Sequence, residues 1–367
     1  MLSLELSPVF SRLERAVTRD MARMFGLGEH SGGIMQSGGS LANLQALALA
    51  RNVRFKPMAQ GLVGLRKPPV LFASQAAHTS IQKAAMLLGL GTQAVVQIPT
   101  DAQSRMDTQA LTQAITQAKA QGQEPFAVVA TAGTTVTGSI DPLPQVAAIA
   151  RQHGLWFHVD AAYGGALMLS EKARGLLTGI ERADSVTFNP QKWLYVTKVC
   201  AMLLLREEAH LERYFRTDLP YMQNSEDFIN YGEIGVQGTR HPDVLSLWLT
   251  MQHLGKQQMG RLVDQAMETA QAFYQRVCQR PWLTPATQPE TGVVVFRATP
   301  SWVPAQGHDD LNVNLQARLL QEAGVFVALS RYADKNWLRG VVLNPYTGEE
   351  QLERLFSALD AFLEQSR

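Results

Sequence analysis

Short apolar runs alternate with helical patterns through the first part of the chain. The runs are apolar at nearly every position, and such runs predict strands that are buried on both faces of a sheet. Strands are expected at 70–73, 94–98, 126–130, 155–159, 185–188 and 200–205. Helices are expected between them, at 80–88, 108–120 and 144–153. This alternation predicts an α/β fold with a mostly parallel sheet and helices on both faces.

The segments on either side of this alternation predict further elements. An amphipathic helix is expected at 11–25, a Gly-rich stretch follows at 26–39, and 41–51 is a strong helix former. An almost wholly helical segment at 245–277 would bridge two domains. After it, strands are expected at 292–296, 325–329 and 340–343, and helices at 311–322 and 349–364. These last elements predict a small C-terminal α+β domain.

Chain length and element pattern together predict a division into domains. At 367 residues the chain is long enough for about two domains. We expect an N-terminal helical segment at 1–25, a large domain at 26–255 and a small domain at 256–367.

Composition argues against several classes of protein. Hydrophobic residues make up 46% and charged residues 18%, as in a well-packed globular enzyme. The net charge of +1 favours neither nucleic acid nor a membrane surface as a partner. No signal peptide or membrane span is evident. Cys200 and Cys278 are too few for a disulfide framework, so we expect a cytoplasmic protein.

Two of the strand-like runs end near residues of opposite charge. The run at 155–159 leads to Asp160, and the run at 185–188 leads to Lys192 in Asn189-Pro-Gln-Lys-Trp193. A pyridoxal phosphate site needs such a pair. The lysine forms a Schiff base with the cofactor aldehyde, and the carboxylate keeps the pyridine nitrogen protonated. Either residue alone would more often be a surface charge or a helix cap.

A candidate phosphate loop, Ser37-Gly-Gly-Ser40, stands directly before the helix expected at 41–51. Glycines let the backbone approach an anion, and the N–H groups at a helix start favour negative charge. The alternative is a simple capped helix after a turn. Asn43 would be either helical surface or a brace for this loop.

His78 and Thr135 also follow strand-like runs. In open α/β sheets, ligands bind beyond the carboxyl ends of the strands, which is where both are expected together with Asp160 and Lys192. His78 would stack on a pyridine ring or act on protons, although a lone histidine is more often a cap. His158 and Asp160 face the same side of a strand, but two ligands are too few for a metal site, and none is expected.

Together these residues resemble the group II pyridoxal-phosphate-dependent amino acid decarboxylases, which include aromatic-L-amino-acid, glutamate, tyrosine and 2,4-diaminobutyrate decarboxylases. The markers are Ser37-Gly-Gly-Ser-Leu-Ala-Asn43, His78-Thr-Ser80, Gly133-Thr-Thr135, His158-Val-Asp-Ala-Ala-Tyr163, Asn189-Pro-Gln-Lys-Trp193, Gly238-Thr-Arg-His241 and Leu338-Arg339. The resemblance implies the aspartate aminotransferase-like fold, fold type I. It also implies a homodimer with the active site at the interface.

The resemblance implies a role toward pyridoxal 5'-phosphate for each matching residue. Lys192 would form the Schiff base, and Asp160 would pair with the pyridine nitrogen. His78 would stack over the ring, and Ala162 would pack under it. The remaining cofactor residues would hold the phosphate or lie near the ring's substituents: Ser37, Gly38, Gly39, Ser40, Asn189 and Thr135, with Thr239 approaching across the dimer interface.

Two further residues are implied to act on the substrate. Arg339 matches the arginine that binds the substrate carboxylate. Tyr221, in Asp218-Leu-Pro-Tyr221, matches the tyrosine of a mobile catalytic loop, which returns a proton to the substrate carbon. The chain departs from the family at Gln191, where a histidine is usual, and in a short N-terminus that starts near the end of the family's helical arm.

The expected activity is the decarboxylation of an L-amino acid to a primary amine and carbon dioxide. The substrate itself is left open. An aldehyde synthase or aminotransferase-like activity is the alternative among enzymes; Tyr221 disfavours it and Gln191 weakens that argument slightly. The alternative of another class is a non-catalytic relative that acts as a binding subunit. The short N-terminus motivates that reading, and Lys192, Asp160 and His78 oppose it.

Overall fold

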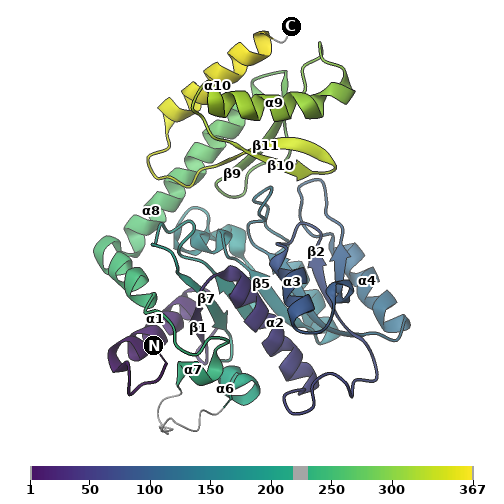
Figure 1. Cartoon of the computed structure of the whole chain (residues 1–367), viewed down its shortest axis with the longest axis vertical. Coiled ribbons are helices and arrows are strands. Elements are labelled where there is room, and N and C mark those ends of the chain that lie inside the picture. Colours follow the sequence, from purple (N-terminus) through teal and green to yellow (C-terminus); the bar gives the residue numbers. More distant parts are fainter. Residues whose placement is uncertain (1, 218–229, 366–367) are drawn as a thin grey trace.

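A mostly parallel sheet forms the centre of the larger part of the molecule (Figure 1). The computed structural model describes residues 2–217 and 230–365. The seven strands follow the order β1-β7-β6-β5-β4-β2-β3. They are β1 (Gly32–Gln36), β2 (Pro69–Ser74), β3 (Val95–Ile98), β4 (Glu124–Thr131), β5 (Trp156–Asp160), β6 (Ser185–Phe188) and β7 (Ala201–Leu205). Among these strands β7 alone runs in the direction opposite to the other six, which confirms the expected fold class.

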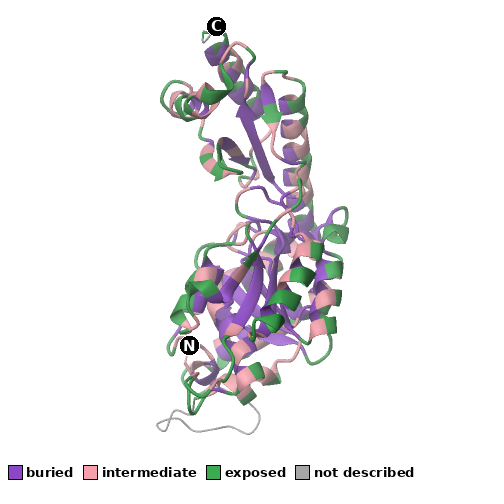
Figure 2. Cartoon of the chain, turned by 90° about the vertical axis from the view of Figure 1, so that its right-hand side faces the viewer, coloured by how far each residue is buried: buried purple, intermediate pink, exposed green. Residues whose placement is uncertain are grey.

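Helices cover both faces of this sheet, which explains why its strands are apolar at successive positions. Val128 packs into the hydrophobic cluster on one face and Val129 into the cluster on the other. Strands accordingly form the buried centre of the molecule, and exposed residues lie on the outer helices (Figure 2). The helices are α1 (Pro8–Met24), α2 (Gly39–Phe55), α3 (Ser80–Leu87), α4 (Thr108–Ala120), α5 (Leu143–His153), α6 (Ala209–Phe215) and α7 (Tyr231–Ile234).

A second sheet lies at the C-terminal end and is antiparallel. Its order is β10-β11-β9-β8, formed by β8 (Leu283–Pro285), β9 (Val293–Ala298), β10 (Ala328–Tyr332) and β11 (Lys335–Val341). Helices α9 (His308–Gln321) and α10 (Glu349–Glu364) lie beside it (Figure 1). The long α8 (Val244–Cys278) connects the two parts and is interrupted at Gly255, where φ is 72° and ψ is 166°.

Short 3-10 segments complete the described chain. They lie at Thr92–Ala94, Gly164–Leu169, Arg174–Leu177, Ile180–Arg182 and Ala305–Gly307. Among the described helices, none is both long enough and apolar enough to cross a membrane.

Four strands differ from expectation. The Gly-rich stretch contains β1, whose Gly33 approaches β7 so closely that a Cβ atom would clash with the carbonyl oxygen of Leu203. Strand β8 was not expected. The predicted strands at 325–329 and 340–343 are displaced toward each other and form the β10–β11 hairpin. Ala333 and Asp334, both with positive φ, form its two-residue turn.

Candidate active site

A cavity of about 570 Å³ lies at the carboxyl ends of the central strands. Its walls come from the segments that follow β1, β2, β4, β5 and β6. The structure brings together here the following residues that the sequence predicted: Ser37, Gly38, Gly39, Ser40, His78, Thr135, Asp160, Ala162, Asn189 and Lys192.

The predicted phosphate loop forms the N-terminal end of α2. Gly38 adopts a φ of 147°, and helix α2 begins at Gly39. A Cβ atom at Gly39 would lie 2.8 Å from Nδ2 of Asn189, so only glycine lets this amide approach the loop. The Oδ1 atom of Asn189 is buried and has no hydrogen-bond partner within the described chain. Helix-start N–H groups and a nearby amide suit a phosphate.

Asp160 ends β5 at the cavity wall and is 5% exposed. Its Oδ1 accepts a hydrogen bond from the backbone N–H of Ala162 at 3.1 Å. Its Oδ2 accepts one from Nδ2 of Asn43 at 2.8 Å. These donors orient the carboxylate, and carboxylate lone pairs remain for a further N–H donor.

Lys192 lies in the turn after β6, where its backbone N–H donates to the carbonyl of Asn189 at 3.0 Å. Burial lowers the pKa of the Lys192 amine, and the charge of Asp160 partly opposes this shift. A lowered pKa increases the fraction of neutral amine, which is the form that attacks an aldehyde.

His78 is oriented by its neighbour Ser80 on the other wall of the site. Its Nδ1 lies 2.8 Å from Oγ of Ser80 and 3.2 Å from the backbone nitrogen of Ser80. Ser80 Oγ in turn accepts a hydrogen bond from Nδ2 of Asn43 at 2.9 Å. Asn43 is therefore a buried link between Asp160 and Ser80 and not a residue of the helix surface; its described side-chain hydrogen bonds go to these residues and to His158, not to the Ser37–Ser40 loop.

A second cavity, of about 200 Å³, adjoins the first and shares Gly133, Thr135, Tyr163 and Lys192 with it. Arg339 lines this smaller cavity, together with the apolar side chains of Val293, Val341 and Leu343. The guanidinium of Arg339 donates from Nη1 to the carbonyl oxygen of Thr135 at 2.6 Å. A cation thus lies in a small pocket that opens beside Lys192.

Tyr163 forms a wall between the two cavities. Its ring stacks on that of Trp193, with centroids 4.7 Å apart and planes 5° apart. Burial raises the pKa of the Tyr163 hydroxyl, so it stays protonated at neutral pH.

Gln191 lines the larger cavity with its side chain fixed by the backbone. Its Oε1 accepts a hydrogen bond from the N–H of Cys200 at 2.6 Å, and its own N–H donates to the Cys200 carbonyl at 3.2 Å. Because a backbone N–H requires an acceptor, the amide oxygen is the engaged atom. The amide nitrogen is the part of Gln191 left to serve as a donor.

One predicted residue, Thr239, lies outside these two cavities. Thr239 lines a separate cavity of about 340 Å³, which contains Ser37 as well. The structure does not place Thr239 among the residues around Lys192. Tyr221 lies outside the described residues.

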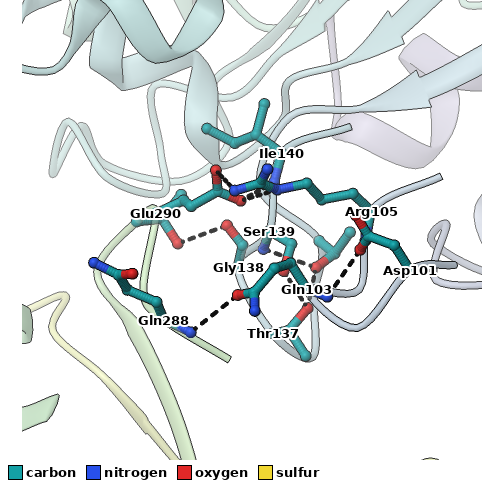
Figure 3. A network of polar contacts seen from close by, with 11 residues as sticks. Asp101, Gln103, Arg105, Thr137, Gly138, Ser139, Ile140, Gln288 and Glu290 are labelled. Carbon is teal, nitrogen blue, oxygen red and sulfur yellow. Dashed lines mark hydrogen bonds and ion pairs between the residues drawn. The ribbon is translucent and has the colours of Figure 1, made fainter. Parts of the chain in front are cut away.

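The loop that carries Thr135 is held by residues from the C-terminal part of the chain (Figure 3). Glu290 accepts hydrogen bonds from Arg105 and from the backbone N–H of Ile140. The hydroxyl of Thr291 donates to the carbonyl of Gly138 at 3.1 Å. Glu290 could not be predicted from the sequence, because its partners Arg105 and Ile140 are far away in the chain and no local motif surrounds it.

These features fit pyridoxal phosphate. An anion-binding helix start, a buried carboxylate and an amine of lowered pKa surround one cavity, and they match a phosphate, a pyridine nitrogen and an aldehyde. The fit rests on the chemistry of the donor set and on the close approach of Asn189 to Gly39.

Comparisons with known proteins agree with this chemistry. The model of the pyridoxal-dependent decarboxylase conserved domain matches residues 1–299. Cysteine sulfinic acid decarboxylase of Mus musculus is 34% identical over 373 residues, covering 97% of this chain and 75% of that protein. Acidic amino acid decarboxylase GADL1 of Bos taurus is 32% identical over 372 residues, covering 97% and 71%. The crystal structure of mouse CSAD in apo form has a TM-score of 0.90 and 33% identity, covering 98% and 77%.

Proposed function

Because the chain belongs to the pyridoxal-dependent decarboxylases, we propose that Lys192 anchors the cofactor for the decarboxylation of a short acidic amino acid. The family makes the protein a carboxy-lyase that acts on an amino acid with pyridoxal 5'-phosphate. The assignment of residues and the choice of substrate are the proposal. The observation that carries it is the common cavity of Lys192, Asp160 and the loop before α2.

In this proposal each group of residues has a defined role toward the cofactor or the substrate. Ser37–Ser40 and Asn189 hold the phosphate, and Asp160 accepts the N–H of the pyridine ring. When bound, the cofactor withdraws the electrons that carbon dioxide leaves behind. Ala162 and His78 confine the ring, and Lys192 supplies the amine that binds its aldehyde. Tyr221 returns the proton to the substrate carbon, so that the product is a primary amine.

The smaller cavity is proposed to bind the substrate. The guanidinium of Arg339 can form an ion pair with a substrate carboxylate. Its hydrogen bond to the carbonyl oxygen of Thr135 fixes the orientation of the guanidinium. The relatives named for cysteine sulfinic acid and for acidic amino acids support the acidic class.

The test is the release of carbon dioxide from a panel of amino acids, with the purified chain and saturating pyridoxal phosphate. The panel contains cysteine sulfinate, aspartate, glutamate, 2,4-diaminobutyrate and tryptophan. We expect the short acidic substrates to give the highest kcat/KM. A preference for tryptophan or 2,4-diaminobutyrate would contradict the proposed class.

We also propose an oligomeric state, a domain division and a cellular location for the protein. A homodimer with the site at its interface is supported by Thr239, which lines a cavity beside Ser37, and by Leu87, which is exposed and lines the larger cavity. A domain division at 255 and 256 is supported by the interruption of α8 at Gly255. A cytoplasmic location is supported by the free thiols of Cys200 and Cys278.

A further inference from the structure

A buried chain of polar side chains runs beneath the cavity and ends at Asp160. Trp156, His158 and Asp160 alternate along β5 and so face the same side of the sheet. Ser185 of β6 is the register partner of His158, and Asn43 of α2 lies above the same face. His158 and Ser185 are fully buried, and Asn43 is 1% exposed.

The contacts along this chain form a continuous series. Trp156 Nε1 donates to Oγ of Ser185 at 2.8 Å, and that hydroxyl lies 2.8 Å from Nδ1 of His158. Nε2 of His158 lies 3.1 Å from Oδ1 of Asn43. Nδ2 of Asn43 then donates to Asp160 Oδ2 at 2.8 Å and to Ser80 Oγ at 2.9 Å.

The directions of the hydrogen bonds follow from the two ends of the series, an indole N–H that only donates and a carboxylate that only accepts. An indole N–H only donates, so Ser185 Oγ accepts from Trp156 and its own hydrogen can point to His158 Nδ1. Burial lowers the pKa of His158 to about 4, so the imidazole is neutral and carries a single hydrogen. The Asp160 carboxylate only accepts, so Asn43 presents Nδ2 to it and Oδ1 to His158 Nε2, which places the hydrogen on Nε2. Nε2 therefore donates to the oxygen of the Asn43 amide.

We infer that Asn43 and His158 are positioning residues: His158 fixes the Asn43 amide so that its nitrogen, and not its oxygen, faces Asp160. The opposite orientation would place the amide oxygen against the carboxylate, where the two acceptors repel. In the observed orientation the same amide nitrogen also holds Ser80, which orients His78. One amide thus sets both the carboxylate proposed for the ring nitrogen and the imidazole proposed for the ring face.

This inference rests on the proposed function only through the role of Asp160. It predicts a property of the full chain that does not depend on turnover. With ¹⁵N-labelled histidine, NMR should find His158 neutral and protonated on Nε2, with the signal assigned by its loss in His158→Gln. Protonation on Nδ1 would overturn the inference, because Nε2 would then accept from Asn43 and turn the amide oxygen toward Asp160.

The matched substitution is Asn43→Asp, which keeps the shape of the side chain and removes its N–H donor. Hydrogen bonds to charged groups contribute enough that we expect the Kd for pyridoxal phosphate to rise by about tenfold or more. The kcat should fall by a similar factor, with KM for the amino acid nearly unchanged. The control is Thr187→Val, since this buried hydroxyl lies 3.5 Å from His158 Nε2 and no hydrogen bond joins it to Asp160 among the described contacts.

A second pair of variants, at His158, tests the same positioning role if Asn43→Asp does not fold. His158→Gln retains a neutral N–H donor and should preserve most of the cofactor affinity, whereas His158→Leu should lose it. Equal affinities in these two variants, or unchanged affinity in a folded Asn43→Asp, would overturn the inference. Asp160→Asn serves as the reference. If kcat falls in Asp160→Asn while the Kd for pyridoxal phosphate and kcat are unchanged in Asn43→Asp, only the inference about Asn43 fails. If kcat is unchanged in Asp160→Asn, the proposed role of Asp160 fails together with the inference.

Discussion

Arg105 and Glu290 are joined by two hydrogen bonds of 3.2 and 2.7 Å, although 185 residues separate them in the chain (Figure 3). Arg105 lies after β3, and Glu290 lies between β8 and β9. Glu290 also accepts a hydrogen bond from the backbone of Ile140 at 3.0 Å. Ile140 belongs to the loop whose Thr135 carbonyl orients Arg339, so the ion pair supports the proposed substrate site from the side of the C-terminal sheet.

Glu290→Gln should therefore weaken substrate binding more than it slows the reaction. The substitution removes the charge paired with Arg105 and so loosens the loop that carries Thr135. A partly buried ion pair of this kind contributes about 1 kcal/mol, which corresponds to about a fivefold change in an equilibrium. We expect KM to rise by about fivefold, with kcat changed by less than about twofold. Steady-state kinetics on the preferred substrate measure both.

The control for this prediction is Asp360→Asn. It breaks the Arg280–Asp360 pair, whose atoms lie 2.8 Å apart and which joins α10 to the end of α8 without touching the 134–141 loop. We expect a similar loss of stability and no change in KM. Equal KM values for Glu290→Gln and Asp360→Asn would show that the Arg105–Glu290 pair does not act on the substrate site.

Lys192→Ala should abolish turnover. Lys192 is the amine that lines both the larger and the smaller cavity, and burial lowers its pKa. Borohydride treatment of the parent should attach the cofactor covalently to the chain, and mass spectrometry should find no such adduct in the variant. A cofactor still trapped on the protein in Lys192→Ala would refute the assignment.

Asp160→Asn should fold and bind cofactor but decarboxylate far more slowly. The amide keeps the shape of the side chain and loses the charge that stabilises a protonated pyridine nitrogen. We expect kcat to fall by about 10²-fold or more, as for the loss of a group that acts on the transition state. Absorbance of the bound cofactor verifies occupancy. Activity close to that of the parent would remove Asp160 from the electron-withdrawing role.

Much of the fold was predictable because its signals are local. A strand such as β4 sends Val128 and Val129 to opposite covered faces, so both positions must be apolar, and an unbroken apolar run identifies it. In parallel strands the carboxyl ends meet at one edge of the sheet. Asp160 and Lys192 could therefore be expected to lie together from their positions after two such runs.

The remainder depends on contacts that no local pattern encodes. Gly33 reads as a loop residue, yet it lies in β1 because the close approach of Leu203 leaves no room for a side chain. Asn43 and Asp160 are 117 residues apart, so their hydrogen bond follows only from the packing of α2 on the sheet. The β10–β11 hairpin was displaced in the prediction because its exposed strands lack a continuous apolar run.

Tyr221→Phe should change the product rather than the binding of the cofactor. The substitution removes only the hydroxyl that the family resemblance makes the proton donor. Without this hydroxyl, the substrate carbon that has lost carbon dioxide stays unprotonated for longer and reacts with oxygen. We expect slower amine release and more aldehyde and ammonia. Mass spectrometry of the products, with and without oxygen, gives the ratio. An unchanged rate and ratio would make Tyr221 an ordinary loop residue.

His158 should make the stability of the protein fall as the pH is lowered. Burial holds its pKa at about 4 in the folded chain, below the ordinary value of 6.5. Between these values the unfolded chain binds a proton that the folded chain does not, so the free energy of unfolding decreases as pH falls from 6.5 toward 4. The slope is at most about 1.4 kcal/mol per pH unit, and the total is about 3 kcal/mol. Above pH 6.5 the contribution of His158 to the slope vanishes.

Urea unfolding at several pH values between 7.5 and 5, at a constant saturating cofactor concentration, measures this slope. His158→Gln cannot take up a proton, so its free energy of unfolding should fall less steeply than that of the parent over this range. The difference between the two proteins should grow as the pH decreases and be constant above 6.5. His30→Gln, at an exposed position, is the control and should follow the parent. Parallel curves for the parent and His158→Gln would mean that His158 takes up its proton as readily in the folded protein as in the unfolded chain, and the fixed direction of the hydrogen bonds to Asn43 would then be lost as well.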